Sequence, residues 1–126
     1  MALNALHHIT VMTKDLDATR DFYRDILGLK EGFRPKLPFS GYWLYCGEVP
    51  VVHLVPNTNP LGAGKSEDTG PFDHFAFLAE DVEGVRKALD EKGIKYLHNR
   101  MESPPMDQLF FRDNNRVMIE LNFPGR

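Results

Sequence analysis

The sequence feature that most constrains the fold is an internal repeat. Residues 6–15 read LHHITVMTKD and residues 72–81 read FDHFAFLAED. A shift of 66 positions (74 − 8) places His8 on His74. With the same shift or one residue more or less, the later segments 28–30 and 42–56 resemble 93–95 and 109–124. A chain with such a repeat is predicted to fold as one supersecondary unit written twice.

Each copy carries the same order of secondary-structure signals. A short β-type run comes first, and an aspartate that can cap a helix follows it. Apolar residues then recur at intervals of three and four until a glycine ends the pattern, which is typical of an amphipathic helix. Three more strand-like runs complete the copy. The predicted strands are 6–13, 29–34, 41–46 and 50–55 in the first copy and 72–79, 95–100, 107–112 and 117–123 in the second; the helices start at Asp15 and Asp81 and stop at Gly28 and Gly93.

This order predicts an α+β fold made of two tandem βαβββ modules, with helices on one face of a curved, partly open mixed sheet. We expect a single domain, 1–126, with the modules at 5–56 and 72–124. The segment 57–71, NTNPLGAGKSEDTGP, is polar and rich in glycine and proline, which is typical of a linker. The turns at 47–50 and 113–116 contain glycine and asparagine, which tolerate a left-handed backbone.

Composition narrows the classes of function. The chain has 126 residues, of which 42% are hydrophobic, and a formal net charge of −3. Lysines and arginines are scattered, so neither nucleic acid nor an anionic membrane is expected as a partner. No apolar run approaches the ~20 residues of a membrane span, and the N-terminus lacks the pattern of a signal peptide. Cys46 is the only cysteine, which fits a cytoplasmic protein, and we expect it to be a small buried residue.

Four polar side chains are predicted to face inward from strands. Alternation along 50–55 and 117–123 puts His53 and Glu120 among apolar neighbours, while His8 and His74 lie near the start of the first strand of each copy. The repeat makes His8 the counterpart of His74 and His53 the counterpart of Glu120. Imidazole nitrogen and carboxylate oxygen are ligands for divalent Zn, Ni, Mn or Fe(II). We therefore predict one metal site built from these four residues.

Each of the four has a purely structural alternative. His8 or His74, taken singly, resembles a hydrogen-bonded core histidine, and His53 resembles a partly exposed strand residue. A salt bridge to an arginine would equally explain Glu120. The repeat favours metal ligation because it accounts for the four residues together.

Five further polar residues are left outside the predicted site. His7 is expected to face away from His8, and His98 is expected at the surface. The remaining three could orient an anionic substrate but are equally good surface residues: Arg34, Arg100 and Gln108.

The same segments carry a resemblance to a known family. LHHITVMTKDLDATRDFYRDILGLKE, FDHFAFLAEDVEGVRKALDEKGIKYL and FFRDNNRVMIELNF resemble, in this order, the vicinal oxygen chelate superfamily. That superfamily includes glyoxalase I, extradiol dioxygenases, fosfomycin-resistance thiol transferases, methylmalonyl-CoA epimerase and bleomycin-resistance proteins. The resemblance covers essentially the whole chain and implies that His8, His74 and Glu120 match the family's His/His/Glu metal ligands. Glyoxalases add a fourth ligand, usually glutamate, where this chain has His53. Short members commonly dimerise, so the resemblance also implies a homodimer.

Two classes of function follow. The first is a metal-dependent enzyme acting on a small oxygen-chelating substrate, either a glyoxalase-like lyase or isomerase or an extradiol-dioxygenase-like oxidoreductase. In it the ion stabilises the developing oxyanion and Glu120 moves the proton. The second is a metal-free ligand-binding protein of the bleomycin-resistance kind, with a cavity lined by aromatic residues: Tyr42, Trp43, Tyr45, Phe110 and Phe111. A structural role with a vestigial site is a third alternative.

Overall fold

The computed structural model describes residues 5–57, 72 and 74–125. The chain divides into two compact units, Met1–Lys65 and Ser66–Arg126, and each unit contains one copy of the repeat. The predicted linker, 57–71, lies outside the described residues except for its first position. Within the described ranges, no helix is both long enough and apolar enough to cross a membrane.

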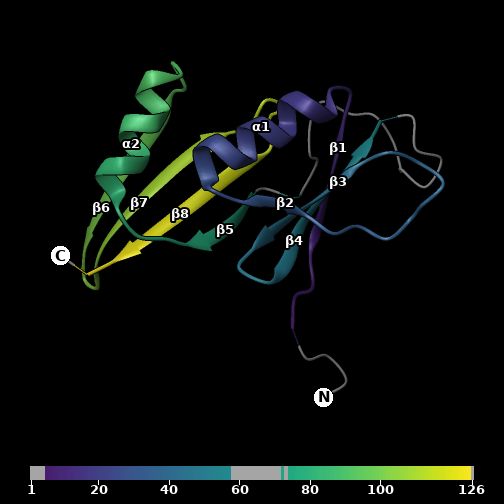
Figure 1. The fold of residues 1–126 in the computed structure, drawn as a ribbon. Coiled ribbons are helices and arrows are strands. Elements are labelled where there is room, and N and C mark those ends of the chain that lie inside the picture. Colours follow the sequence, from purple (N-terminus) through teal and green to yellow (C-terminus); the bar gives the residue numbers. More distant parts are fainter. Residues whose placement is uncertain (1–4, 58–71, 73, 126) are drawn as a thin grey trace. The chain divides into compact units, whose positions relative to one another are not determined.

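The first module folds as βαβββ, in the predicted order (Figure 1). Its elements are β1 (Ile9–Thr13), α1 (Leu16–Leu27), β2 (Lys30–Gly32), β3 (Tyr42–Cys46) and β4 (Val49–Pro56). The strands form a sheet in the order β1-β4-β3-β2, in which β1 runs parallel to β4 and the other neighbours are antiparallel. Helix α1 contacts β2, β3 and β4 of this sheet.

The second module repeats this topology (Figure 1). Its elements are β5 (His74–Leu78), α2 (Val82–Glu91), β6 (Tyr96–Glu102), β7 (Pro105–Arg112) and β8 (Met118–Pro124). The sheet order is β5-β8-β7-β6, again with one parallel pair, β5 and β8. The predicted α+β fold of two βαβββ modules is confirmed, and the mixed sheet takes the form of two four-stranded sheets, one in each module.

Helix α1 starts and stops where the sequence predicts. The Asp15 carboxylate accepts a hydrogen bond from the Ala18 N–H at 3.0 Å, which satisfies a free donor of the first turn. Gly28 ends the helix in a left-handed conformation with a φ of 73°. Three residues at helical spacing form the buried face: Thr19, Tyr23 and Ile26.

Helix α2 has the same cap in a different backbone conformation. Asp81 has a φ of 66°, and its carboxylate accepts a hydrogen bond from the Gly84 N–H at 3.1 Å. A Cβ atom on Gly84 would collide with that carboxylate as it is placed here, so a larger residue would require the Asp81 side chain to shift. The helix ends at Glu91, and Gly93, the predicted stop, follows with a φ of 68°.

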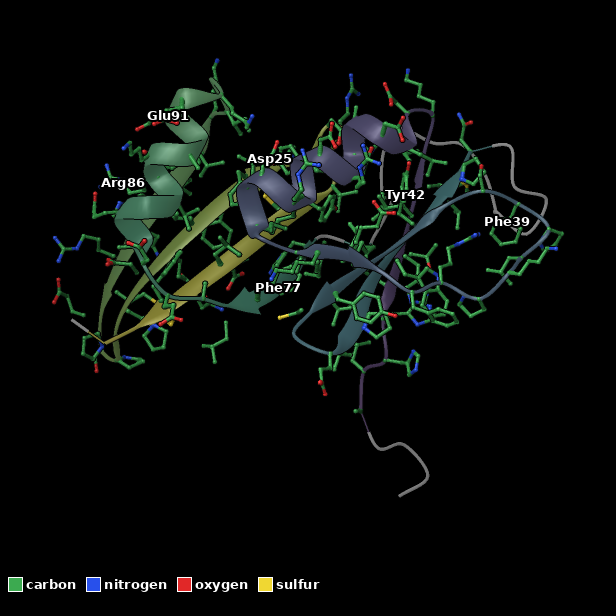
Figure 2. All side chains as sticks on the ribbon, viewed as in Figure 1. Asp25, Phe39, Tyr42, Phe77, Arg86 and Glu91 are labelled. Carbon is green, nitrogen blue, oxygen red and sulfur yellow. The ribbon has the colours of Figure 1, made fainter. Side chains whose placement is uncertain are left out.

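The outer surfaces of both helices carry exposed ion pairs. Figure 2 marks Asp25 on α1 and Arg86 on α2. Arg24 Nε lies 2.8 Å from Asp25 Oδ1, and Arg86 Nη1 lies 3.0 Å from Glu83 Oε1. Exposed pairs of this kind contribute little to stability because water screens them. They mark the solvent side of each helix.

One turn is closed differently from the sequence prediction. In the turn 113–116 the left-handed residue is Arg116, with a φ of 69°, and neither asparagine has a positive φ. The Asp113 side chain accepts hydrogen bonds from the N–H groups of Asn115 at 2.7 Å and Val117 at 2.9 Å. These bonds hold the turn, so a left-handed asparagine is not needed.

Alternation along β8 separates the two faces of the second sheet. Ile119, Leu121 and Phe123 are at most 5% exposed and form the core. Glu120 and Asn122, between them, face the opposite side and are partly exposed. We call this opposite side, which also carries His74, Gln108 and Phe110, the site face.

Candidate metal site

In the first module, His53 lies in a stack of three rings. Its imidazole packs on Trp43 with ring centroids 3.9 Å apart and on His8 with centroids 3.8 Å apart, and both contacts are nearly parallel. Trp43 of β3 is the cross-strand partner of His53 in β4, which explains the first contact. His8 precedes β1, which begins at Ile9, three residues later than the predicted start at residue 6. The structure therefore brings these two predicted ligands together.

The environment of His53 keeps its imidazole neutral. Its side chain is buried, and this burial is the main cause that lowers its pKa to about 4; the neighbouring His8 lowers it further. A hydrogen bond between Nε2 and the Pro50 carbonyl, at 3.1 Å, acts in the opposite direction. Because a carbonyl oxygen only accepts, Nε2 must carry the proton in the neutral ring. The lone pair then lies on Nδ1, the ring nitrogen that could bind a metal ion.

In the second module, His74 and Glu120 form the corresponding pair. Nε2 of His74 lies 2.9 Å from Oε1 of Glu120. The Glu120 side chain is 13% exposed and that of His74 is 35% exposed. Phe110, the cross-strand partner of Glu120, packs edge-on against the His74 ring at 6.3 Å. An imidazole nitrogen and a carboxylate oxygen, both potential metal ligands, thus lie close together on two parallel strands.

A chain of amides leads to Glu120 across the site face. Gln108 Nε2 donates to Glu120 Oε2 at 3.2 Å and to Asn122 Oδ1 at 3.0 Å. Asn99 Nδ2 donates to Gln108 Oε1 at 2.8 Å. The sequence analysis left Gln108 outside the predicted site and did not single out Asn99; the structure shows that both belong to the hydrogen-bonded chain that reaches Glu120. The sequence carries no periodic signal for this chain, because residues 99, 108 and 122 lie on three different strands.

The two pairs occupy the same place in the repeat. On the parallel strands of the second module, His74 lies level with Met118, and Glu120 is two residues further along β8. In the first module Ile9 lies level with Val52, so the register places His8 next to position 51, and His53 is again two residues further along. The predicted correspondence of His8 with His74 and of His53 with Glu120 therefore holds in the backbone.

Each module by itself supplies two potential ligands. In the described parts of the chain, no group of three or more His, Cys, Asp or Glu side chains is placed to hold a metal ion. The structure brings His8 to His53 and His74 to Glu120. A single ion shared by both pairs stays a prediction.

The remaining histidines lie beside or behind the site. His7 is exposed, but its Nδ1 is 2.8 Å from Nδ1 of His8, so it does not point away as expected. His98 was predicted at the surface, yet its side chain is only 21% exposed, with Nε2 3.4 Å from Asp107 Oδ1. It is level with buried Leu109 and so shares the core side of the sheet, opposite the site face.

Two other predicted roles change in the structure. Cys46, expected to be buried, is exposed because it is the last residue of β3, next to a turn. Among the aromatic residues proposed to line a cavity, Tyr42, which Figure 2 labels, accepts a hydrogen bond from Arg20 at 3.0 Å, and Phe111 is 2% exposed. Trp43 is engaged in the ring stack. This set therefore does not form one aromatic cavity within either module.

A shallow hollow of about 430 Å³ includes part of the site face beside His74. Met118, which is level with His74 on the neighbouring strand, contributes to its wall together with Phe110 and Leu97. Lys95 and Arg112 add two positive charges to the lining. The volume falls in the range of small-molecule sites.

Comparison with known proteins agrees with the geometry of the repeat. The sequence model of the Glyoxalase/Bleomycin resistance protein/Dioxygenase superfamily matches residues 5–121. Glyoxylase I 4 of Arabidopsis thaliana is 35% identical over 123 residues, which is 94% of this chain and 70% of the plant protein. The mitochondrial methylmalonyl-CoA epimerase of Bos taurus is 26% identical over 129 residues, covering 94% of this chain and 74% of its own.

Solved structures share the fold. A glyoxalase/dioxygenase from Nostoc punctiforme aligns with a TM-score of 0.78 at 19% identity, over 99% of this chain and 94% of that one. The family match spans both modules and includes the positions of all four predicted ligands. The chain therefore belongs to the Glyoxalase/Bleomycin resistance protein/Dioxygenase superfamily.

Proposed function

We propose that this protein is a metal-dependent enzyme of the vicinal oxygen chelate type, a glyoxalase-like lyase or isomerase that acts on a small oxygen-chelating substrate. Its ligands would be His8, His53, His74 and Glu120, around one divalent ion. The observation that carries this proposal is the repeated register, which gives each module one pair of donors at the same backbone position.

The donor set suits a divalent ion such as Zn, Ni, Mn or Fe(II). Three imidazoles and one carboxylate are nitrogen and oxygen ligands of intermediate hardness. His53 is held neutral, as a metal ligand must be. The ion would act as a Lewis acid that stabilises negative charge developing on the substrate oxygens.

Roles for the protein's own residues follow from their positions. Glu120 would move a proton, because it is the carboxylate among the proposed ligands and lies partly exposed on the site face. The hollow beside His74 would receive the rest of the substrate, with apolar contacts from Met118, Phe110 and Leu97. The two modules that complete the site would come from one chain or from both chains of a homodimer, working in the cytoplasm.

The names of the relatives favour proton-transfer chemistry. The plant protein is called a glyoxylase I and the bovine protein an epimerase, and neither name denotes an oxygenase. We therefore place the lyase or isomerase ahead of the dioxygenase. The metal-free alternative is weakened because Trp43 and Phe111 are committed to the ring stack and the core.

Metal loading tests the proposal directly. Protein stripped with a chelator and reloaded separately with Ni²⁺, Zn²⁺, Mn²⁺ or Fe²⁺ should retain one ion per site after desalting, measured by elemental analysis. Glu120→Gln should weaken this binding by more than about 100-fold, because loss of even an outer partner of a ligand typically costs 10–100-fold. Glu31→Gln, an exposed strand carboxylate, is the matched control.

Activity measurements then separate the reactions. The loaded protein should isomerise the adduct of methylglyoxal and glutathione, with no activity in Glu120→Gln. Oxygen uptake with a catechol and Fe²⁺ would instead support the dioxygenase. If none of the four metals is retained, the proposal fails.

A further inference from the structure

Glu120 is the only one of the four proposed ligands with a hydrogen-bonded chain of side-chain amides behind it in the described structure. The chain runs across three strands of the second sheet, from Asn99 on β6 through Gln108 on β7 to Glu120 on β8. Asn99 and Gln108 are cross-strand partners, so the backbone register holds their amides face to face. A second bond from Gln108 to Asn122 anchors the same NH₂ group.

The direction of every hydrogen bond in this chain follows from Glu120. An ionised carboxylate can only accept hydrogen bonds, so Gln108 must present its NH₂ group to Glu120 Oε2. Its carbonyl oxygen then faces Asn99, which must donate. The amide orientations are therefore fixed by the chemistry of the three groups.

The chain of amides and His74 contact different carboxylate oxygens of Glu120. Oε2 lies 3.2 Å from the Gln108 amide, while Oε1 lies 2.9 Å from His74 Nε2. Because Oε2 is hydrogen-bonded to Gln108, Oε1 is the oxygen directed at His74, the other proposed ligand of this module. Bonds from a donor to a charged acceptor are the stronger kind, so the torsion of the side chain is restrained.

The repeat shows that the fold itself does not require this amide. The first-module counterpart of Gln108 is Gly41 (108 − 67), in the alignment that places Leu44 on Phe111. A Cβ atom at Gly41 would collide with the Leu54 carbonyl oxygen, so no side chain fits there. One module thus folds without any side chain at this position, and the other places a glutamine there that contacts a proposed ligand.

From these observations we propose that Gln108 is a positioning residue for Glu120, supported in turn by Asn99. It sets the carboxylate so that Oε1 alone is presented to the metal ion, as a one-oxygen ligand. This inference rests on the proposed metal site and adds to it a mode of ligation and the residue that enforces it.

The test compares Gln108→Leu with Leu78→Ala. Leucine has nearly the shape of glutamine but cannot donate, whereas Leu78 is level with Asn122 on the same sheet face, 82% exposed and outside both the amide chain and the hollow. We expect Gln108→Leu to raise the dissociation constant for Co²⁺ about 10-fold or more by calorimetry, as other losses of a partner behind a ligand do. Leu78→Ala should stay within twofold of the wild type.

A spectroscopic signature separates positioning from a general structural effect. The visible absorption of bound Co²⁺ depends on coordination number, so a carboxylate released to bind through both oxygens should change its intensity. Gln108→Leu should show this change and Leu78→Ala should not. Unchanged affinity and an unchanged spectrum in Gln108→Leu would overturn the proposal.

Metal-free protein provides an independent arm. The side-chain NH₂ of Gln108 should give two well-separated proton resonances, and Glu120→Gln and Asn99→Ala should both shift them. Asn99 is exposed, so its replacement should preserve the fold. If the wild type binds no Co²⁺ while these shifts appear, the metal site fails and the positioning contact stands. If neither replacement shifts the Gln108 resonances, Gln108 does not contact Glu120 in solution and the positioning proposal fails.

Discussion

The two pairs of proposed metal ligands, His8 with His53 and His74 with Glu120, lie at equivalent backbone positions. Different interactions hold their side chains. His53 is buried between the flat faces of Trp43 and His8, with one carbonyl as its hydrogen-bond partner. The Glu120 carboxylate is instead held at its two oxygens: Gln108 donates a hydrogen bond to Oε2, and His74 Nε2 lies close to Oε1. Duplication kept the register of the strands, and the neighbouring side chains diverged around it.

This difference assigns separate electrostatic tasks to the two modules. Ring faces and burial disfavour charge, so the first module offers a neutral nitrogen donor. Amide donors favour an anion, so the second module offers the negative charge that a divalent ion needs. A carboxylate, which is stabilised at position 120, should therefore reduce the stability of the metal-free protein when it is placed at position 53.

Placing the carboxylate in the wrong module gives the largest expected effect. In His53→Glu the new carboxylate would lie between the Trp43 ring face and His8 and next to the Pro50 carbonyl, so His8 is a potential donor to it, whereas the carbonyl and the ring face are not. A buried charge left without compensation costs about 3–5 kcal/mol, so the metal-free variant should lose at most this much free energy of unfolding. Urea denaturation measures it, and saturating Ni²⁺ should restore a large part.

His53→Gln serves as the control for that exchange. It also removes the imidazole but introduces no charge, so its metal-free stability should lie well above that of His53→Glu. Equal stability of the two variants would show that the first module accepts an anion as readily as the second, and the contrast between the modules would be lost.

The acid dependence of metal-free stability gives the next largest effect. The pKa of His53 is near 4 in the folded chain and near 6.5 when unfolded, so the unfolded state binds the proton first as the pH falls. Stability should therefore be full above pH 6.5 and decline as the pH falls toward 4. The contribution of this one residue is at most about 3 kcal/mol.

Comparison with His53→Gln isolates this contribution. The free energy of unfolding of the wild type, relative to the variant, should fall between pH 6.5 and 4 and then level off. Carboxylates titrate in both proteins and cancel in the difference. A difference that does not vary with pH would mean that His53 is accessible to solvent and that the ring stack does not hold it.

The repeat explains how much of the fold could be predicted. Matching His8 with His74 located both first strands, and the aspartates and glycines around them located both helices. The starts of strands were less certain: β1 begins at Ile9, so His8 falls outside it. Local patterns specify periodicity and caps well but say little about where pairing begins.

The side chains that support the site could not be predicted in the same way. Contact between Gln108 and Glu120 depends on the register of β7 against β8, where Gln108 is level with Asn122. The stack on His53 likewise depends on Trp43 being its partner in β3. Alternation shows which face a residue takes, but the register between strands comes from turns and core packing. The cross-strand partners of each ligand were therefore not readable from the sequence.

The helix caps give the smallest effect and extend the comparison of modules to the backbone. Asp15 has an extended backbone and Asp81 a left-handed one, although each caps its helix in the same way. Asp15→Ala should cost about 1 kcal/mol of unfolding free energy and Asp15→Gly only a few tenths. At Asp81 the alanine variant should cost about 1 kcal/mol more than at Asp15, because alanine resists the left-handed region whereas glycine does not. Urea unfolding of the four variants measures the two Ala-minus-Gly differences, and equal differences would mean that both caps share one backbone conformation in solution.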